Sequence, residues 1–100
     1  MPAKILSRRT KDPNAVLPYS VELASWLGSL GEVSATAAWA IDDPPDGAMV
    51  VDSSAVSGTV ATAVVSGGTD GSTYKLRCRA TTSPSGFVDD FVISIQVIAP

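Results

Sequence analysis

The stretch Tyr-Lys-Leu-Arg-Cys-Arg-Ala-Thr, residues 74–81, decides the fold of this 100-residue chain. Apolar and polar side chains alternate along it, which is typical of a β-strand with one dry face and one wet face. A second alternating stretch, Phe-Val-Ile-Ser-Ile-Gln-Val at residues 91–97, follows a turn sequence at residues 83–86. Two alternating strands around a short turn that contains glycine predict an antiparallel β-hairpin.

Shorter strand patterns precede this hairpin. Alternation or β-branched residues mark residues 19–23, 33–41, 48–52 and 59–65. Strands that are separated by turn residues about every ten positions are typical of two-sheet sandwiches. We therefore predict an all-β, immunoglobulin-like antiparallel β-sandwich of about six to seven strands over residues 19–100. Residues 25–29 break the alternation, and we expect a loop or a single turn there.

Tyr74 lies just inside its strand, directly after a glycine-rich loop at residues 67–71. This position resembles the tyrosine corner of immunoglobulin-like domains, in which the tyrosine hydroxyl binds backbone a few residues upstream. The alternative interpretation is an ordinary aromatic residue of the core.

The first 18 residues have a different character. Pro2, Pro13 and Pro18 interrupt them, and proline lacks the N–H donor that a strand ladder needs. The net charge of −3 divides into +3 for residues 1–12 and −6 for the remainder. We therefore predict an extended, basic N-terminal arm over residues 1–18. Its charge fits either a contact with another subunit or a solvated tail, and the absence of interleaved aromatic residues disfavours nucleic acid.

Residue types that carry most enzyme chemistry are missing. The chain has no histidine, which excludes Ser-His and Cys-His arrangements. Its single cysteine, Cys78, cannot build a zinc or iron–sulfur site, and its place in an alternating strand predicts a buried structural thiol. The carboxylates of Asp42, Asp43 and Asp46 are interrupted by prolines, which favours a turn over a calcium loop. We predict no enzyme activity, no cofactor and no metal site; without an apolar stretch of about 18 residues, we also expect no membrane partner.

Two segments carry a family resemblance. Residues 11–19, Lys-Asp-Pro-Asn-Ala-Val-Leu-Pro-Tyr, with Trp26-Leu27 after them, resemble the opening of the fiber-tail adaptors of tailed bacteriophages. Residues 65–74 and the Thr-Thr-Ser of residues 81–83 are similar to a later pattern of that family. The resemblance implies a virion protein of the phage tail, made in the bacterial host cytoplasm, that links tail fibers to the tail or connector.

We therefore predict an adaptor that docks tail fibers onto the tail or connector, in multiple copies within a symmetric assembly. The residues predicted to dock these virion proteins are Lys4, Arg8, Arg9, Lys11, Asp12, Pro13 and Trp26. A capsid or tail decoration protein would share the same fold without attaching fibers. A carbohydrate-binding or adhesin module is a further alternative, because Trp26 is the best candidate for an exposed stacking surface.

Overall fold

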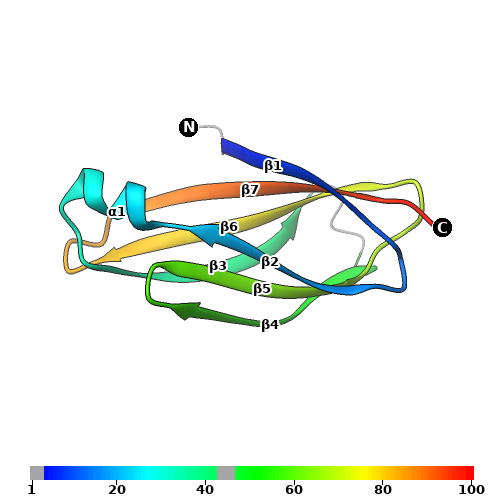
Figure 1. Ribbon diagram of the computed structural model, residues 1–100, viewed down its shortest axis with the longest axis horizontal. Helices are drawn as coiled ribbons and strands as arrows, with labels where there is room; N and C mark the ends of the chain where they lie inside the picture. The colour runs from blue at the N-terminus through cyan, green and yellow to red at the C-terminus, as the bar shows by residue number, and fades with distance from the viewer. Residues whose placement is uncertain (1–3, 43–46) are drawn as a thin grey trace.

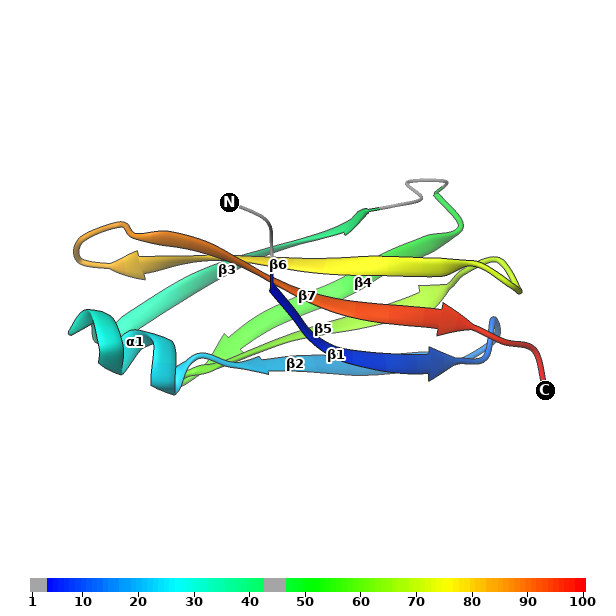
Figure 2. The same ribbon diagram turned by 90° about the horizontal axis from the view of Figure 1, so that it is seen from above.

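Seven strands in two sheets, with one short helix, make up the computed structural model, which describes residues 4–42 and 47–100 (residues 4–6 by their backbone only). The four-stranded sheet has the order β1 (Lys4–Lys11), β7 (Val88–Val97), β6 (Thr73–Ser83) and β3 (Ser34–Asp42). The three-stranded sheet has the order β2 (Val16–Glu22), β5 (Val60–Gly67) and β4 (Met49–Ser57). Figures 1 and 2 show the two sheets lying against each other, with their strands running roughly along the long axis of the molecule. The predicted all-β sandwich is confirmed, whereas its immunoglobulin-like label stays a prediction.

The predicted hairpin forms the centre of the larger sheet. Strands β6 and β7 pair antiparallel, with Cys78 opposite Phe91 and Leu76 opposite Ile93. The inward side chains of β6 are fully buried, as the alternation predicts: they are Tyr74, Leu76, Cys78 and Ala80. Side chains from β2 and β5, including Val21 and Val65, complete the core from the other sheet.

The hydroxyl of Tyr74 binds upstream backbone, as the tyrosine-corner comparison predicts. It accepts a hydrogen bond of 2.8 Å from the backbone N–H of Thr69. The aromatic ring is completely buried. The bond therefore fixes the glycine-rich loop between β5 and β6 onto the start of β6.

Replacing Tyr74 with phenylalanine should lower the free energy of unfolding by about 1–2 kcal/mol, because the Thr69 N–H loses its acceptor. Tyr19 offers a matched control, since its buried hydroxyl has no hydrogen-bond partner among the described residues. Tyr19→Phe should leave stability unchanged or slightly raised. Urea denaturation of both variants measures the difference, and equal losses would contradict it.

The predicted N-terminal arm is not confirmed. Residues 4–11 form β1, which pairs with β7 in parallel. The register of this pairing shifts between Ile5 and Ser7. Strand β2 then spans the expected boundary between residues 18 and 19. The prolines permit this arrangement: Pro13 falls in the connection between β1 and β2, and Pro18 lies on an edge strand, where a missing donor is tolerated.

A short helix, α1 (Ala24–Leu30), replaces the loop or single turn expected near residues 25–29. Leu27 is its buried residue, and the Glu22 carboxylate accepts the N–H of Ala24 at 2.9 Å. The helix ends at Gly31, which has a φ of 69° and donates its N–H to the carbonyl of Gly28. Apolar burial and this left-handed ending stabilise a helix that is too short to persist alone.

Candidate protein-docking site

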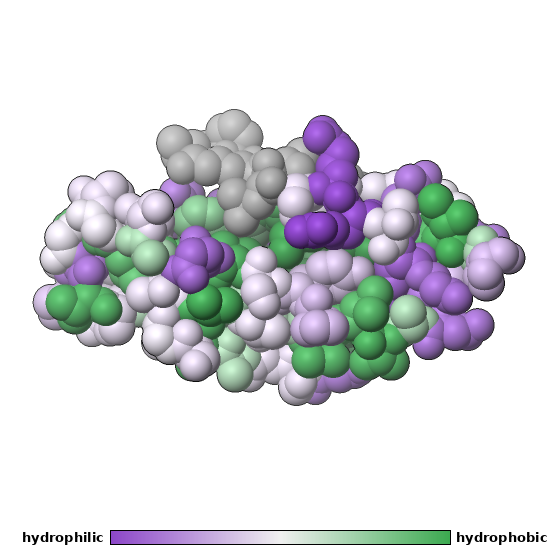
Figure 3. All heavy atoms as spheres, viewed as in Figure 1, coloured by the Kyte–Doolittle hydropathy of each residue, from purple (hydrophilic) through white to green (hydrophobic). Residues whose placement is uncertain are grey.

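Positive charge is concentrated on one of the two sheets. All seven Lys and Arg residues of the chain lie in β1 and β6, which belong to the four-stranded sheet. The three-stranded sheet carries no cation and holds only the acidic residues Glu22 and Asp52. Figure 3 shows strongly hydrophilic atoms over the region of β1, while the area over β4 and β5 is mostly pale or green. The two sheets therefore offer chemically different surfaces.

Most cations of known side-chain position are engaged within the molecule. Arg79 forms a bidentate pair with Asp90, with contacts of 2.8 and 2.9 Å. Arg77 lies 3.2 Å from Asp42. The hydrogen bonds from Arg79 hold the pKa of the Asp90 carboxyl below its usual value. These pairs balance charge on β6 and strengthen the contacts between its neighbouring strands.

Lys11 is buried rather than available for docking. Its side chain is 2% exposed, and its ammonium donates to the carbonyls of Gly67 at 2.7 Å and Asp12 at 2.9 Å. Burial lowers the pKa of this ammonium, against the opposing influence of Asp12 and Asp52. Lys11 thus ties the end of β1 to the end of β5, and its side chain presents little surface for the predicted docking.

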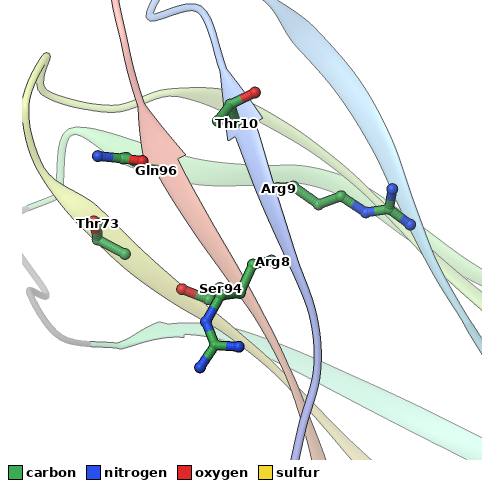
Figure 4. A pocket seen from close by; sticks show the side chains of 6 residues that line it. All are labelled: Arg8, Arg9, Thr10, Thr73, Ser94 and Gln96. Atoms are coloured by element: carbon green, nitrogen blue, oxygen red, sulfur yellow. The ribbon is translucent and has the colours of Figure 1, made fainter.

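Arg8 and Arg9 differ from these cations. Both are exposed, and within the described residues neither guanidinium makes a hydrogen bond or an ion pair. Consecutive strand residues point to opposite faces. Accordingly, Figure 4 shows Arg8 reaching over β7 on the outer face of the sheet, whereas Arg9 points toward β2.

A groove lies on the outer face beside Arg8. Its volume is about 640 Å³, and it is lined by Arg8, Arg9, Thr10, Thr73, Ser94 and Gln96. Hydroxyl and amide groups from β6 and β7 form its floor, as Figure 4 shows. Guanidinium, hydroxyl and amide groups together suit a carboxylate better than an apolar ligand.

A second cleft lies between β1 and β2, which are the edge strands of the two sheets on the same side of the molecule. It has a volume of about 450 Å³, and Arg9, Leu17, Tyr19 and Ile93 are among its lining residues. The Tyr19 side chain is only 7% exposed, and its hydroxyl lacks a partner among the described residues. Burial raises the pKa of this hydroxyl, while the charge of Arg9 opposes the rise.

The remaining predicted residues have separate roles. Asp12 shapes the connection before β2, because its carboxylate accepts the N–H of Asn14 at 2.8 Å, and Pro13 lies within the same connection. Trp26 is half-buried and packs edge-on against Phe91, with ring centroids 5.4 Å apart. This contact leaves Trp26 less surface for stacking on a sugar than the sequence predicts. Lys4 pairs through its backbone with Phe91 at the start of β1.

The sequence names Arg8 and Arg9 as docking candidates but does not point to the groups around them. The alternation predicts Ser94 and Gln96 only as solvent-facing positions of their strand, because nothing in the sequence shows that β1 lies beside them. The sequence predicts Tyr19 as a core residue. Only the structure shows that its hydroxyl lacks a hydrogen-bond partner among the described residues and that its side chain lines the cleft between β1 and β2.

Within residues 4–42 and 47–100, no cluster of acidic, cysteine or histidine side chains is arranged to hold a metal ion. Over the same residues, no helix has the length and apolar character needed to cross a membrane.

The fold and this surface define a small β-sandwich protein with a cationic sheet edge suited to protein contacts. The chain belongs to the family described as Podophage GP4 fiber-tail adaptor protein gp77, whose profile matches residues 11–96. No curated protein matches the chain. The family is a structural component of the phage tail, which places the protein in the virion, in contact with other virion proteins. The match begins at Lys11, so Arg8 and Arg9 precede the matched residues.

Proposed function

We propose that the protein docks tail fibers onto the tail or connector of a podophage, in several copies within a symmetric assembly. Its family supports a fiber-tail adaptor role. The observation that carries the docking surface is the pair of exposed arginines on the edge strand β1, Arg8 and Arg9, which have no ion pair with any residue that the structure describes. The partners are proteins rather than nucleic acid or membrane.

The sandwich suits such a role mechanically. The two stacked sheets share one continuous core, so forces applied at the β1 edge are transmitted through β7 and β6. Each contact at an exposed charged edge is weak on its own. Repetition of the same contact in several copies makes the attachment firm without a large interface on each copy.

Point substitutions test this proposal better than a deletion of residues 1–12, which would remove a strand of the sheet. The double variant Arg8→Ala/Arg9→Ala changes the net charge by −2. The matched control, Ser53→Glu/Ala55→Glu, also changes it by −2 at exposed positions of β4, on the other side of the sandwich. Both variants should fold, because all four positions are exposed.

Virions assembled with each variant should differ in their fiber content. We expect the arginine variant to reduce attached fibers by about tenfold, because every copy loses its charged contacts. The β4 control should retain fibers at the wild-type level. Quantitative gel analysis of purified particles measures both the adaptor and the fibers, and full fiber loading by the arginine variant would contradict the proposal.

A further inference from the structure

We propose that β1 accepts an extended acidic segment of a partner protein, which adds as a strand along the free edge of β1 and places carboxylates against Arg8 and Arg9. This inference deepens the proposed function and rests on it, because it names the chemistry and the binding mode of the docked partner. It assigns to β1 the role of an acceptor strand, in place of an arm that reaches out to a neighbour.

The backbone of β1 offers an edge for pairing. Among the described strands, β7 is its only neighbour, so the opposite side of β1 presents unpaired N–H and C=O groups. The pairing of Ser7 through Lys11 with β7 is regular, and no proline interrupts Lys4–Lys11. The corresponding edge of β2 contains Pro18, which removes a donor from that strand. Of these two adjacent edges, β1 is therefore the better template for a new strand.

The two arginines define the partner's charge and spacing. Arg8 lies on the outer face and Arg9 on the side of β2, so each meets a different face of an added strand. Side chains of directly opposed residues on paired strands lie within contact distance. Two successive acidic residues of the partner would thus meet Arg8 and Arg9 in turn, each through a charge-assisted hydrogen bond.

The second cleft supplies an independent reason for a partner. The Tyr19 hydroxyl is buried and has no hydrogen-bond partner in the described part of the chain, and Arg9 lines the same cleft. Buried polar groups normally have a hydrogen-bond partner, so a hydroxyl without one among the described residues can still bind an acceptor supplied from outside. A carboxylate held by Arg9 and reached by Tyr19 would satisfy both groups. Arg9 already points to this side, whereas Arg8, which reaches over β7, has to turn toward the incoming strand. An exposed arginine that has no ion pair among the described residues can do so.

Charge favours a protein segment over a nucleic acid. Besides Arg8 and Arg9, the two hollows are lined by hydroxyl, amide and aliphatic groups, and among the described residues Tyr19 is the only aromatic one that lines them. Nucleic-acid grooves use aromatic faces for base stacking together with many cations. Residues 13–100 carry a net charge of −6, which repels a phosphate backbone.

Fluorescence anisotropy tests the inference with a labelled peptide, Thr-Val-Thr-Glu-Asp-Val-Thr-Val, and its neutral counterpart, Thr-Val-Thr-Gln-Asn-Val-Thr-Val. We expect the full chain to bind the acidic peptide at least about tenfold more tightly than the neutral one. Arg8→Ala/Arg9→Ala should lose this preference, and the β4 control Ser53→Glu/Ala55→Glu should keep it. Tyr19→Phe should weaken binding several-fold while remaining as stable as the wild type.

Amide hydrogen exchange supplies the structural readout. The acidic peptide should slow exchange of edge-facing amides within residues 7–11 and leave residues 53–57 of β4 unchanged. Equal affinity for both peptides, unchanged binding by the arginine variant, protection confined to β4, or tighter binding of an oligo-dT probe at the same edge would each overturn the inference.

The two proposals fail in distinguishable ways. If the arginine variant loses fibers from particles but the wild-type protein shows no acidic-peptide preference, the proposed function stands and strand addition is wrong. If the peptide binds as expected but variant particles carry normal fibers, the β1 edge binds acidic strands without serving fiber attachment.

Discussion

Replacing Gly67 with alanine should lower the free energy of unfolding by about 3–4 kcal/mol. Gly67 ends β5 with a φ of 80°, a conformation that residues with a Cβ adopt at a cost. A Cβ at this position would also overlap the backbone carbonyl oxygen of Ala48. That carbonyl accepts the N–H of Gly68 at 2.9 Å, so it cannot move without losing a hydrogen bond. The cost of the backbone strain and the cost of the overlap therefore add in the free energy of unfolding.

Gly71 is the matched control for this prediction. Its φ is 88°, but a Cβ there would meet nothing within 4 Å. Gly71→Ala should cost only the backbone strain, about 1–2 kcal/mol. Urea denaturation of both variants separates the two contributions. Equal destabilisation would show that the chain near Ala48 yields easily and that the overlap carries no energy.

Gly67 matters for the docking edge as well as for the core. Its carbonyl oxygen accepts the ammonium of Lys11, which lies at the end of β1. A shift of the backbone at Gly67 would therefore disturb the anchor that fixes β1 beside the three-stranded sheet. The position of Arg8 and Arg9 on the same strand depends on this anchor, which links packing in the sandwich to the proposed function.

The sequence was sufficient where the pattern was local and long. Residues 74–81 alternate without exception, so both the strand and its buried face could be predicted, including Cys78. The hairpin partner is near in sequence, and short-range pairing needs only a turn between the strands. The hydroxyl contact of Tyr74 was also predictable, because its position after a glycine-rich loop is a recurring arrangement.

Strand β1 could not be predicted for the opposite reason. Its partner β7 lies at the far end of the chain and pairs with it in parallel. Its inward positions include Ser7, Arg9 and Lys11, which read as polar and exposed. Lys11 is buried only because two carbonyl oxygens meet its ammonium, and those acceptors depend on the assembled fold. Arg8 and Arg9 could be proposed from their charge alone, but the hollows that they line could not be predicted.

Stability should fall by about 2 kcal/mol between pH 9 and pH 11 because of the Cys78 thiol. Burial, assisted by the negative charge of Asp90, raises the pKa of this thiol from 9.0 to about 11. In the unfolded chain the thiol deprotonates near its ordinary pKa, while the folded protein still holds its proton. The folded state thus binds more protons in this window, so its stability is complete below pH 9 and declines as the pH rises toward 11.

The variant Cys78→Ala isolates this contribution, because alanine cannot ionise and fits an apolar site. It should be less stable than the wild type at pH 7, since it leaves a small cavity where the sulfur was. Tyr19 and Lys11 also have shifted pKa values, but they titrate in both proteins and cancel in the comparison. Urea denaturation at several pH values from 7 to 11 should show the advantage of the wild type shrinking by about 2 kcal/mol. Parallel stability curves for the two proteins would mean that the folded chain exposes the thiol to water and that the core around β6 opens readily.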